Sequence, residues 1–464
     1  MSHNSRVRDP VHNFITLREI EVKLLSTRLL QRLRGVRQLA MANLVYPGAL
    51  HTRFDHTLGV CHIAGMMAER LDLTDDQTEL VRLAALLHDL GHGPFSHVSE
   101  YALEIYADRD VLPEDQKKEK IHEVITAHLI QSDPELGRYI SEDRRTEIVN
   151  LLATGHGPPI LRSIVSGPLD ADKQDYLLRD SRFCGVQYGV FDLHQLHRSF
   201  VKVGSADEYE LMIDLDGIHA LEQFVLAKYY LTTNVYRHRV RLVSDQMIVR
   251  AILLGIESDN IEDLRRIYTF DGSPEFFDRF VALNDTRFLY QFDSIEKPDT
   301  KCGDLLTRLQ FRQLHKRIFS ARIQEFTNPE VKQALQDVSK PDSRSLRTDI
   351  ERAVCEIVRQ KIGGTIDPDY VIVHGFDIKS VRTSSRNDEA SIMIDRRPEP
   401  IPFEQDSTLF ESIDEGFTDG YIEIYAPVLW NTPTDRARHL RELAQPLRDS
   451  IEQTVAATLE QGGQ

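Results

Sequence analysis

The fold depends on the stretch Glu79-Leu-Val-Arg-Leu-Ala-Ala-Leu-Leu-His-Asp-Leu-Gly-His-Gly-Pro-Phe-Ser-His97. An apolar helical run ends abruptly in His88 and Asp89, and the Gly-His-Gly-Pro that follows stops the helix. Burying an unpaired carboxylate costs on the order of several kcal/mol, so a core helix has no structural reason to end this way. A metal ion removes that cost, because it supplies positive charge and accepts both nitrogen and oxygen ligands. The plain alternative for so short a motif is a capped surface turn with a stray histidine.

The composition indicates an ordinary globular protein. The 464 residues are 41% apolar and 28% charged, which suits two or three domains or one large helical domain with additions. The net charge of 56 − 73 = −17 argues against a dedicated nucleic-acid coat, but it is compatible with a phosphorylated substrate. The four scattered cysteines indicate reduced thiols. Because we find neither a signal peptide nor an apolar run of ~20 residues, we expect a cytoplasmic protein without membrane contact.

Apolar periodicity predicts a mostly α fold. We expect a helix over 26–43, a β-hairpin at 201–213 and a long helical stretch from about 217 to 256. The character changes after about 362, where a smaller α+β region begins. Its expected strands lie at 370–373, 391–394 and 421–425, and a helix over 434–459 follows them. We therefore divide the chain into a core over 1–362 and a C-terminal α+β region over 363–464.

Four residues from separate segments form a metal-binding set: His56, His88, Asp89 and Asp172. They supply two imidazole nitrogens and two carboxylates, a combination that suits Mn²⁺, Mg²⁺, Fe²⁺, Ni²⁺ or Zn²⁺. On an octahedral ion, four protein ligands leave two positions for water and a phosphate oxygen. Such an ion polarises a phosphoryl group and lowers the pKa of bound water, so we expect metal-dependent phosphate chemistry.

The motifs around this set lie at 46–49, 51–60, 88–97, 122–123 and 170–180. Their order, His…His-Asp…Asp, is the signature of the HD-domain metal-dependent phosphohydrolases. The chain closely resembles the deoxynucleoside triphosphate triphosphohydrolase branch, which includes the catalytic domain of the sterile-alpha-motif and HD-domain protein. The resemblance is dense over 6–190 and thin from there to about 256. It implies an HD-domain helical core, with the metal motif within 46–182. It also implies cleavage of a dNTP into deoxynucleoside and inorganic triphosphate.

The resemblance also implies roles for individual residues. His92 and His97 would face the triphosphate, with His97 donating a proton to the leaving 5′ oxygen. His122 and Glu123 would form a supporting histidine–carboxylate pair. The expected substrate contacts are Arg53 and Lys173 at the phosphates, Tyr176, Asp180 and Tyr236 around the sugar and base, and Lys228 where relatives place a phosphate-binding arginine. Structural roles are expected for His12, in packing the N-terminal arm, for His51, and for Asp170 and Asp175, at a helix start.

The sequence is compatible with more than one mode of regulation and more than one partner. Mammalian-type relatives read the guanine of an activating GTP with an aspartate where this chain has Ser26, although Gln31 and Arg34 match. Activation by another nucleotide, or none, is therefore an alternative to GTP. Relatives are commonly oligomeric, so we expect a homo-oligomer, a dimer or a tetramer. The arginine-rich segment 28–37 keeps binding of single-stranded nucleic acid open as a second activity.

Two other functions compete with the dNTP triphosphohydrolase. The same metal centre could act on another nucleotide or on an oligonucleotide. Alternatively, the chain could be a nucleotide- or single-strand-binding module with a vestigial metal site. The three additional histidines at 92, 97 and 122 argue against a binding module, which has no need of them.

Overall fold

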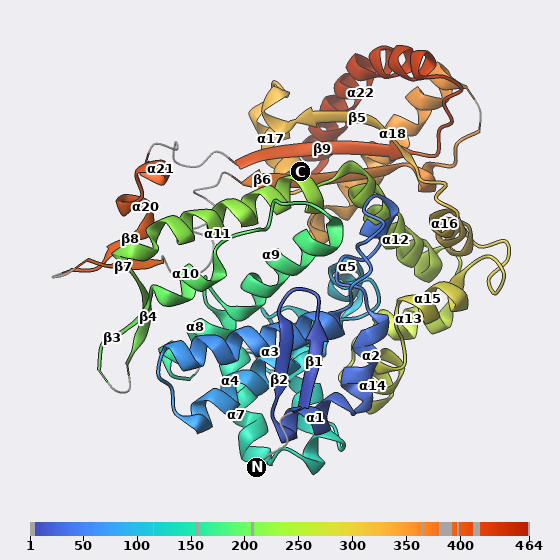
Figure 1. Cartoon of the computed structure of the whole chain (residues 1–464). Helices are drawn as coiled ribbons and strands as arrows, with labels where there is room; N and C mark the ends of the chain where they lie inside the picture. Colours follow the sequence, from blue (N-terminus) through green and yellow to red (C-terminus); the bar gives the residue numbers. More distant parts are fainter. Residues whose placement is uncertain are drawn as a thin grey trace. The chain divides into compact units, whose positions relative to one another are not determined.

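The computed structural model describes residues 5–114, 116–153, 157–205, 208–363, 365–379, 392–396, 399–411 and 418–462 (Figure 1). Helices dominate these residues, so the predicted mostly α fold with smaller α+β parts is confirmed. The chain forms two compact units that alternate along the sequence. The first holds residues up to Arg237, Thr269–Phe288 and the segment from 380 to 416. The second holds His238–Tyr268, Leu289–Lys379 and the residues from Phe417 onwards. The residues after 362 therefore do not form one separate unit, because strands beyond that point belong to both units.

Three helices form the centre of the first unit: α3 (Arg53–Arg70), α4 (Asp75–Leu87) and α9 (Ala171–Cys184). Each begins at a side-chain cap, because Thr52, Thr74 and Asp170 accept the backbone N–H three residues ahead. Helix α3 packs against both α4 and α9, while α7 (Glu142–Leu152) and α8 (Pro159–Ser166) pack against α4. The caps fix where each helix starts, and thereby which side chains its first turn directs to the shared interior.

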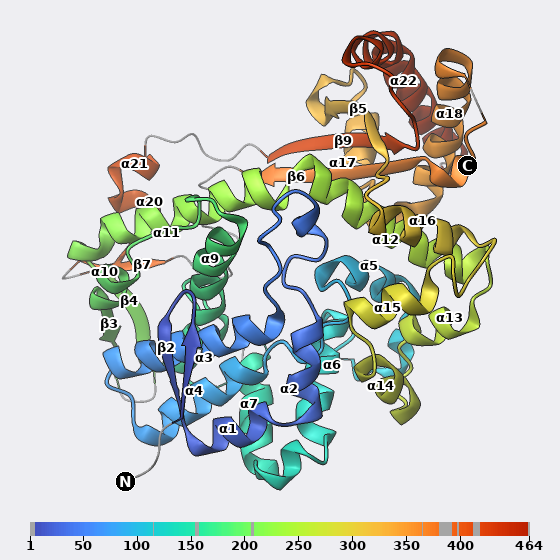
Figure 2. The same cartoon turned by 45° about the vertical axis from the view of Figure 1, so that its right-hand side comes forward.

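The N-terminal segment is more ordered than an extended arm. Strands β1 (Ser5–Asp9) and β2 (Asn13–Leu17) pair as an antiparallel hairpin, and α1 (Glu19–Leu25) follows. Strand β2 packs against α3. In both views the strands of the hairpin cross this helix (Figures 1 and 2).

The prediction of one helix over 26–43 is wrong beyond the first turns. Helix α2 covers only Arg28–Arg32, and a short 3₁₀ turn ends at Gly35. A Cβ at Gly35 would lie 2.5 Å from the side-chain nitrogen of Asn284, so the chain passes this neighbour without a side chain. Beyond it, the Arg37 N–H donates to the Asp285 carboxylate (3.0 Å), and the Val36 carbonyl accepts the N–H of Arg53 (2.9 Å). These tertiary hydrogen bonds replace those of a continuing helix.

The predicted β-hairpin is present as β3 (Phe200–Val203) and β4 (Glu210–Asp214). It belongs to a four-stranded sheet of order β3-β4-β7-β8, with β7 at Met393–Asp395 and β8 at Ile401–Pro402. Ser391, in the expected strand 391–394, lies outside the described residues.

The predicted long helical stretch is interrupted by a π-helical turn at Thr232–Tyr236, which follows α11 (Ile218–Leu231) and precedes α12 (Arg239–Glu257). The other helices of this unit are α5 (His97–Tyr106), α6 (Ile121–Ser132), α10 (Leu193–Arg198), α14 (Pro274–Val281), α20 (Phe403–Asp406) and α21 (Thr408–Glu411), and α15 (Asp285–Phe292) holds residues of both units.

The second unit is built on a three-stranded antiparallel sheet of order β5-β9-β6 (Figure 2). Its strands are β5 (Lys316–Arg322), β9 (Thr418–Ala426) and β6 (Ile372–Lys379), so the strands expected near 370 and 421 are confirmed. Helices α18 (Arg344–Ile362) and α22 (Pro433–Gly462) pack together. Side chains from these helices and from the sheet, such as Val354, Leu447 and Ile422, form the core of the unit. The remaining helices are α13 (Glu262–Tyr268), α16 (Lys301–Gln310) and α17 (Pro329–Gln336). No helix among the described residues is both long and apolar enough to cross a membrane.

A buried histidine in the second unit predicts a pH-dependent stability. His315 is 3% exposed, and neither ring nitrogen has a hydrogen-bond partner within the described parts of the chain. Burial, with the positive charge of Arg308, lowers its pKa to about 3. Below pH ~6.5, His315 is protonated in the unfolded chain but stays neutral in the folded chain. Its contribution to the free energy of unfolding is therefore complete above that pH and is lost as the pH falls. Between pH 7 and 5 we expect His315 to contribute about 2 kcal/mol to the loss of stability, and His315→Leu to remove that contribution. Denaturant unfolding at both pH values checks this, and an equal pH dependence in the variant would contradict it.

Candidate active site

The start of α3 places two of the predicted site residues. Thr52 and Asp55 form a capping box, in which the Asp55 carboxylate accepts the Thr52 N–H at 2.8 Å. The cap makes Arg53 the first residue of the helix. Arg53 and His56 are three residues apart, so in this helix they lie on one face. Both side chains are buried, at 2% and 0% exposure. The loop before α3 and its cap therefore fix the position of one expected metal ligand and one expected phosphate contact.

The end of α4 places the next two. His88 is the C-cap of α4, and Asp89 follows it directly. The turn beyond packs against α6, because Gly91 donates its N–H to Thr126 Oγ1 (2.9 Å). A Cβ at Gly91 would lie 2.0 Å from the His122 carbonyl oxygen, so only glycine allows this approach. The turn thus brings His122 of α6 beside the His-Asp motif.

Two residues after this turn adopt left-handed backbone conformations. Phe95 has φ 61° and Ser96 has φ 54°, values that cost strain in non-glycine residues. Asp285 accepts the Phe95 N–H at 2.8 Å. Ser96 Oγ accepts from Arg53 Nε at 2.7 Å and donates to the Arg37 carbonyl at 2.7 Å. These contacts hold the strained turn that places His97 at the first position of α5.

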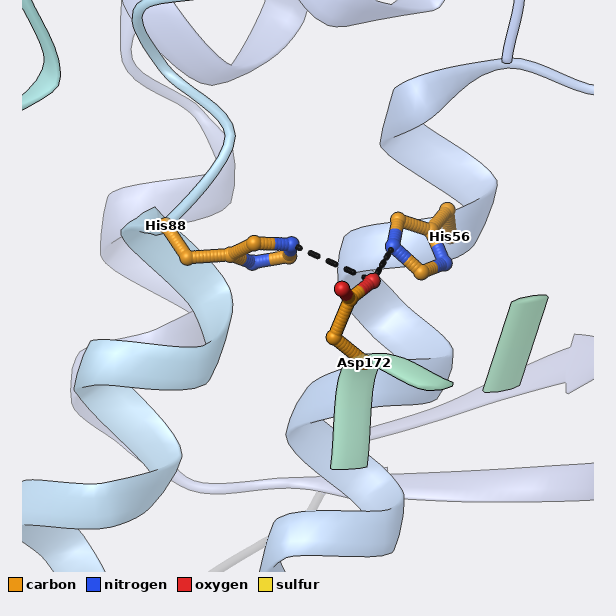
Figure 3. Close-up of side chains that lie close together, drawn as sticks. All are labelled: His56, His88 and Asp172. Carbon is orange, nitrogen blue, oxygen red and sulfur yellow. Dashed lines mark hydrogen bonds and ion pairs between the residues drawn. The ribbon is translucent and has the colours of Figure 1, made fainter. Parts of the chain in front are cut away.

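The four expected metal ligands converge in the structure. Figure 3 shows His56, His88 and Asp172, whose ligand atoms lie within 4.8 Å of one another. Asp172 Oδ1 is 2.8 Å from His56 Nε2 and 3.8 Å from His88 Nε2. Asp89 completes the group, with Oδ1 3.2 Å from His88 Nε2 and Oδ2 4.0 Å from His56 Nε2. Residues from three helices and one turn are thus gathered around a common point.

The donor atoms of this cluster fit a divalent cation. His88 Nδ1 contacts the Ala85 carbonyl at 2.8 Å, so Nδ1 carries the hydrogen and Nε2 keeps its lone pair. That Nε2 atom is buried and makes no hydrogen bond to any described residue. His56 Nδ1 is held by Asp175 Oδ2 at 2.8 Å, which leaves Nε2 to face Asp172. Two imidazole nitrogens and two carboxylates facing one point are a typical ligand set for such an ion.

The protonation of the cluster agrees with this fit. Burial opposes charge on His56, but its hydrogen bonds to Asp172 and Asp175 raise its pKa to about 10. Burial likewise opposes charge on Asp172, whose pKa nevertheless falls to about 2 beside His56. Asp89 is also buried, and Arg53 and His88 hold its pKa well below the usual range. Both carboxylates are therefore ionised at neutral pH, and a metal ion at His56 Nε2 would take the place of a proton.

The two expected phosphate contacts of this region are both engaged with carboxylates. Arg53 Nη1 donates to Asp89 Oδ2 at 2.6 Å, while its Nη2 is buried and has no hydrogen-bond partner among the residues described. Lys173 Nζ donates to Asp170 Oδ2 at 2.6 Å and to the Gly167 carbonyl at 3.0 Å. Asp170 is the N-cap of α9, so the expected helix-start role of this carboxylate agrees with its position.

Three histidines surround one carboxylate next to the metal cluster. His92 Nε2 lies 3.2 Å from Asp89 Oδ1, and His92 Nδ1 lies 2.6 Å from Glu100 Oε1. The Nδ1 atoms of His97 and His122 lie 3.0 and 3.3 Å from the same Glu100 carboxylate. Burial opposes charge on Glu100, but His97 and His92 hold its pKa well below the usual range. The ionised Glu100 carboxylate therefore lies within 3.3 Å of three imidazoles and has a hydrogen bond with one of them, at His97 Nδ1 (3.1 Å).

The expected partnership of His122 with Glu123 is not found. Glu123 is exposed and its carboxylate lies 3.8 Å from Lys120 Nζ, because neighbouring residues on a helix point in different directions. Glu100 of α5 takes that place. Sequence reasoning missed it, although its position three residues after His97 matches the helical spacing at which side chains meet.

This exchange of carboxylates gives a direct prediction. Glu100→Gln is expected to reduce turnover about 10- to 100-fold, because the neutral amide cannot stabilise a protonated imidazole beside it. Glu123→Gln, on the same solvent-exposed side as Lys120, should change turnover by less than about twofold. Steady-state rates of the two variants at matched metal content check this. The opposite order of effects would return the supporting role to Glu123.

A separate polar cluster forms around Asp180 of α9. Asp180 Oδ1 is 2.7 Å from His51 Nε2, and Asp180 Oδ2 accepts from the Tyr236 hydroxyl at 2.6 Å. Tyr236 lies in the π-helical turn, and its ring packs edge-on against that of Tyr176, with 6.3 Å between centroids. The expected sugar and base residues therefore lie together. Lys228 lies one helix earlier, on α11, where it is partly buried.

The two residues expected to contact a regulatory nucleotide are also neighbours. Gln31 and Arg34 are exposed, and Arg34 Nε donates to Gln31 Oε1 at 3.0 Å. The Arg34 guanidinium lies 3.6 Å from the centre of the Phe54 ring. Gln31 also donates to the Leu25 carbonyl at 2.6 Å. Their regulatory role stays a prediction.

Comparison with known proteins identifies two family regions along the chain. Residues 53–180 match the HD domain, and residues 195–427 match the HD associated region. YwfO of Bacillus subtilis is 31% identical over 334 residues, which are 68% of this chain and 72% of YwfO. The HD-domain core expected from the sequence is thereby confirmed.

More distant relatives carry a named activity. The deoxynucleoside triphosphate triphosphohydrolase SAMHD1 of Homo sapiens is 28% identical over 343 residues, and its homologue in Dictyostelium discoideum is 28% identical over 330. Each match covers 67% of this chain, but the chain spans only 54% and 59% of the two relatives. A solved phosphohydrolase from Bacteroides thetaiotaomicron shares the fold, with a TM-score of 0.69 and 22% identity over 91% of this chain and 99% of that one.

Proposed function

This chain belongs to the HD-domain family with the HD associated region, and from that premise we propose that it hydrolyses a dNTP to deoxynucleoside and inorganic triphosphate. The family makes it a hydrolase of the phosphohydrolase superfamily. The proposal of dNTP hydrolysis rests on one observation, which is that two clusters of side chains share a residue. The His56–His88–Asp89–Asp172 group shares Asp89 with the histidine group around Glu100, since His92 Nε2 lies 3.2 Å from Asp89 Oδ1.

Each cluster has its own part in the proposed reaction. A divalent ion held by His56, His88, Asp89 and Asp172 would supply Lewis-acid chemistry at the phosphoryl group. Arg53 is fixed beside Asp89, and its buried Nη2 is available to donate to a phosphate oxygen. The guanidinium cannot turn away, because Ser96 Oγ holds its Nε at 2.7 Å.

Proton transfer to the leaving group falls to His97. When the bond from the α-phosphorus to the 5′ oxygen breaks, that oxygen needs a proton, since a free alkoxide is a poor leaving group. Desolvation lowers the pKa of His97, and the ionised Glu100, 3.0 Å from its Nδ1, opposes that shift, so the protonated imidazole is a strong proton donor held beside a counter-charge. The His97 side chain is 64% exposed, so its outer nitrogen is accessible to a substrate.

The selection of a deoxyribose would come from the Asp180 group. Asp180 is only 1% exposed and is held on both oxygens, by His51 and by Tyr236. A fixed carboxylate of this kind can accept a hydrogen bond from a 3′-hydroxyl, while the Tyr176 and Tyr236 rings limit the space for a 2′-hydroxyl. His51 thus has a positioning role in this proposal, beyond the structural one expected from the sequence.

Product analysis tests the proposal. The purified chain is incubated with each of the four dNTPs and the four NTPs, in Mn²⁺ or Mg²⁺, with and without GTP, and the products are resolved by ion exchange. We expect deoxynucleoside and intact triphosphate from dNTPs, with NTPs much poorer substrates. Orthophosphate or a nucleoside monophosphate as the product would move the activity to another HD phosphohydrolase reaction. Dependence on GTP would establish an activator, and the remaining partners, an oligomer and single-stranded nucleic acid, stay predictions.

A further inference from the structure

The turn of the β1–β2 hairpin lies directly behind a candidate metal ligand. His12 Nε2 is 2.6 Å from Asp175 Oδ1, and Asp175 Oδ2 is 2.8 Å from His56 Nδ1. The His12 side chain is 4% exposed, and those of Asp175 and His56 are 0% exposed. A buried chain of hydrogen bonds therefore runs from the hairpin turn through α9 to His56 on α3.

A second set of contacts joins the turn to Asp175. Arg179, one helical turn further along α9, donates to both oxygens of Asp175, at 2.7 and 3.0 Å. Its Nη1 also donates to Asp9 Oδ2 at 2.9 Å. The other oxygen of Asp9 accepts the backbone N–H groups of Val11 and His12, each at 2.8 Å. Asp9 thus shapes the turn that carries His12, and Arg179 keeps Asp9 beside Asp175.

Gly59 of α3 leaves the space that this arrangement needs. A Cβ at this position would lie 1.8 Å from Asp175 Oδ1 and 2.4 Å from Arg179 Nη2. Any side chain here would displace the carboxylate that contacts His56. The close approach of α3 and α9 at Gly59 is therefore needed for the same hydrogen bonds that the hairpin turn makes to Asp175.

We propose that the hairpin turn is part of the metal site, with His12 as a positioning residue that acts through Asp175 on His56. With the His56 Nδ1–H donating to Asp175, its Nε2 presents a lone pair on the side of Asp172. His12 and Arg179 fix the carboxylate that selects this tautomer and ring orientation. The inference rests on the metal assignment of the proposed function, but it is independent of the substrate.

This arrangement couples metal binding to the order of the hairpin. His12→Ala removes a donor from a buried carboxylate oxygen, so Asp175 and His56 are held less firmly. Loss of such a supporting contact typically weakens metal affinity about 10- to 100-fold. The coupling is reciprocal, so a bound metal must stabilise the hairpin by the same factor. His12→Gln keeps a side-chain N–H donor, so we expect it to recover part of the affinity.

The test measures Mn²⁺ affinity by competition with a chelator, without any substrate. The proteins compared are the wild-type chain, His12→Ala, His12→Gln and His62→Ala. His62 is a matched control, because its ring lies 5.3 Å from that of His12 and, in the described part of the chain, makes no hydrogen bond to Asp175. We expect His12→Ala to bind about 10-fold more weakly, His12→Gln to lie between, and His62→Ala to match wild type. Hydrogen exchange of residues 5–17 should slow when Mn²⁺ is added to the wild-type chain, but not to His12→Ala.

Equal Mn²⁺ affinity in wild type and His12→Ala would overturn the inference, as would hairpin exchange that Mn²⁺ does not change. If His12→Ala fails to fold, as judged by circular dichroism, the exchange of the wild-type chain and the affinity of His12→Gln decide. A wild-type chain that binds no Mn²⁺ would overturn both this inference and the metal assignment. Intact Mn²⁺ binding without the coupling would leave the proposed function standing.

Discussion

Replacing Asp172 by alanine is expected to reduce dNTP turnover at least about 1000-fold and to remove the bound metal. Asp172 Oδ1 lies between His56 Nε2 and His88 Nε2, at 2.8 and 3.8 Å, so its loss removes the oxygen that both imidazoles face. Its side chain is 36% exposed, so the substitution should leave the fold intact. Steady-state kinetics and elemental analysis of the purified variant measure the two effects together.

A matched control for this variant is Asp143→Ala. Asp143 is an exposed acidic residue in the first turn of α7, so its removal changes the net charge equally, away from the site. We expect wild-type turnover and metal content from it. Asp89→Ala should lose activity like Asp172→Ala and also lose stability, because it leaves Arg53 buried without its carboxylate. Turnover retained by Asp172→Ala would refute the metal assignment.

Replacing His97 by alanine is expected to lower kcat about 100- to 1000-fold while metal content stays unchanged. His97 is the first residue of α5, and its side chain is 64% exposed, so the helix does not depend on its ring. The loss would come from the missing proton at the 5′ oxygen. Rates at saturating dNTP, with metal content measured on the same preparation, separate this effect from that of Asp172→Ala.

A second substrate distinguishes proton donation from simple positioning. A dNTP in which sulfur replaces the bridging 5′ oxygen expels a thiolate, which leaves without a proton. The cost of His97→Ala should therefore fall to about tenfold or less on this substrate. An equal loss on both substrates would assign His97 to binding the phosphates and would leave the proton donor to be found elsewhere.

The metal cluster could be predicted from the sequence because its signal is local. The His88-Asp89 pair at the end of an apolar helix is visible in a short window, and so are the motifs that contain His56 and Asp172. The structure brings these residues together through the packing of α3, α4 and α9. The fold class followed from apolar periodicity for the same reason.

What the sequence did not reveal depends on contacts between distant segments. His12 and Asp175 are 163 residues apart, so each was assigned a local role, in arm packing or at a helix start. The resemblance implies Glu123 as the partner of His122, but neighbouring residues on a helix point in different directions. The helix expected over 26–43 ends early because Arg37 donates its N–H to Asp285 and the Val36 carbonyl accepts that of Arg53, which holds this segment extended. Tertiary contacts decided all three outcomes.

Hydrolysis in ¹⁸O-labelled water tests the central claim most directly. The purified chain is incubated with one dNTP and Mn²⁺, and both products are analysed by mass spectrometry. Attack of water on the α-phosphorus predicts one ¹⁸O atom in inorganic triphosphate and none in the deoxynucleoside. Label in orthophosphate or in diphosphate, or a nucleoside phosphate as product, would contradict the proposed reaction.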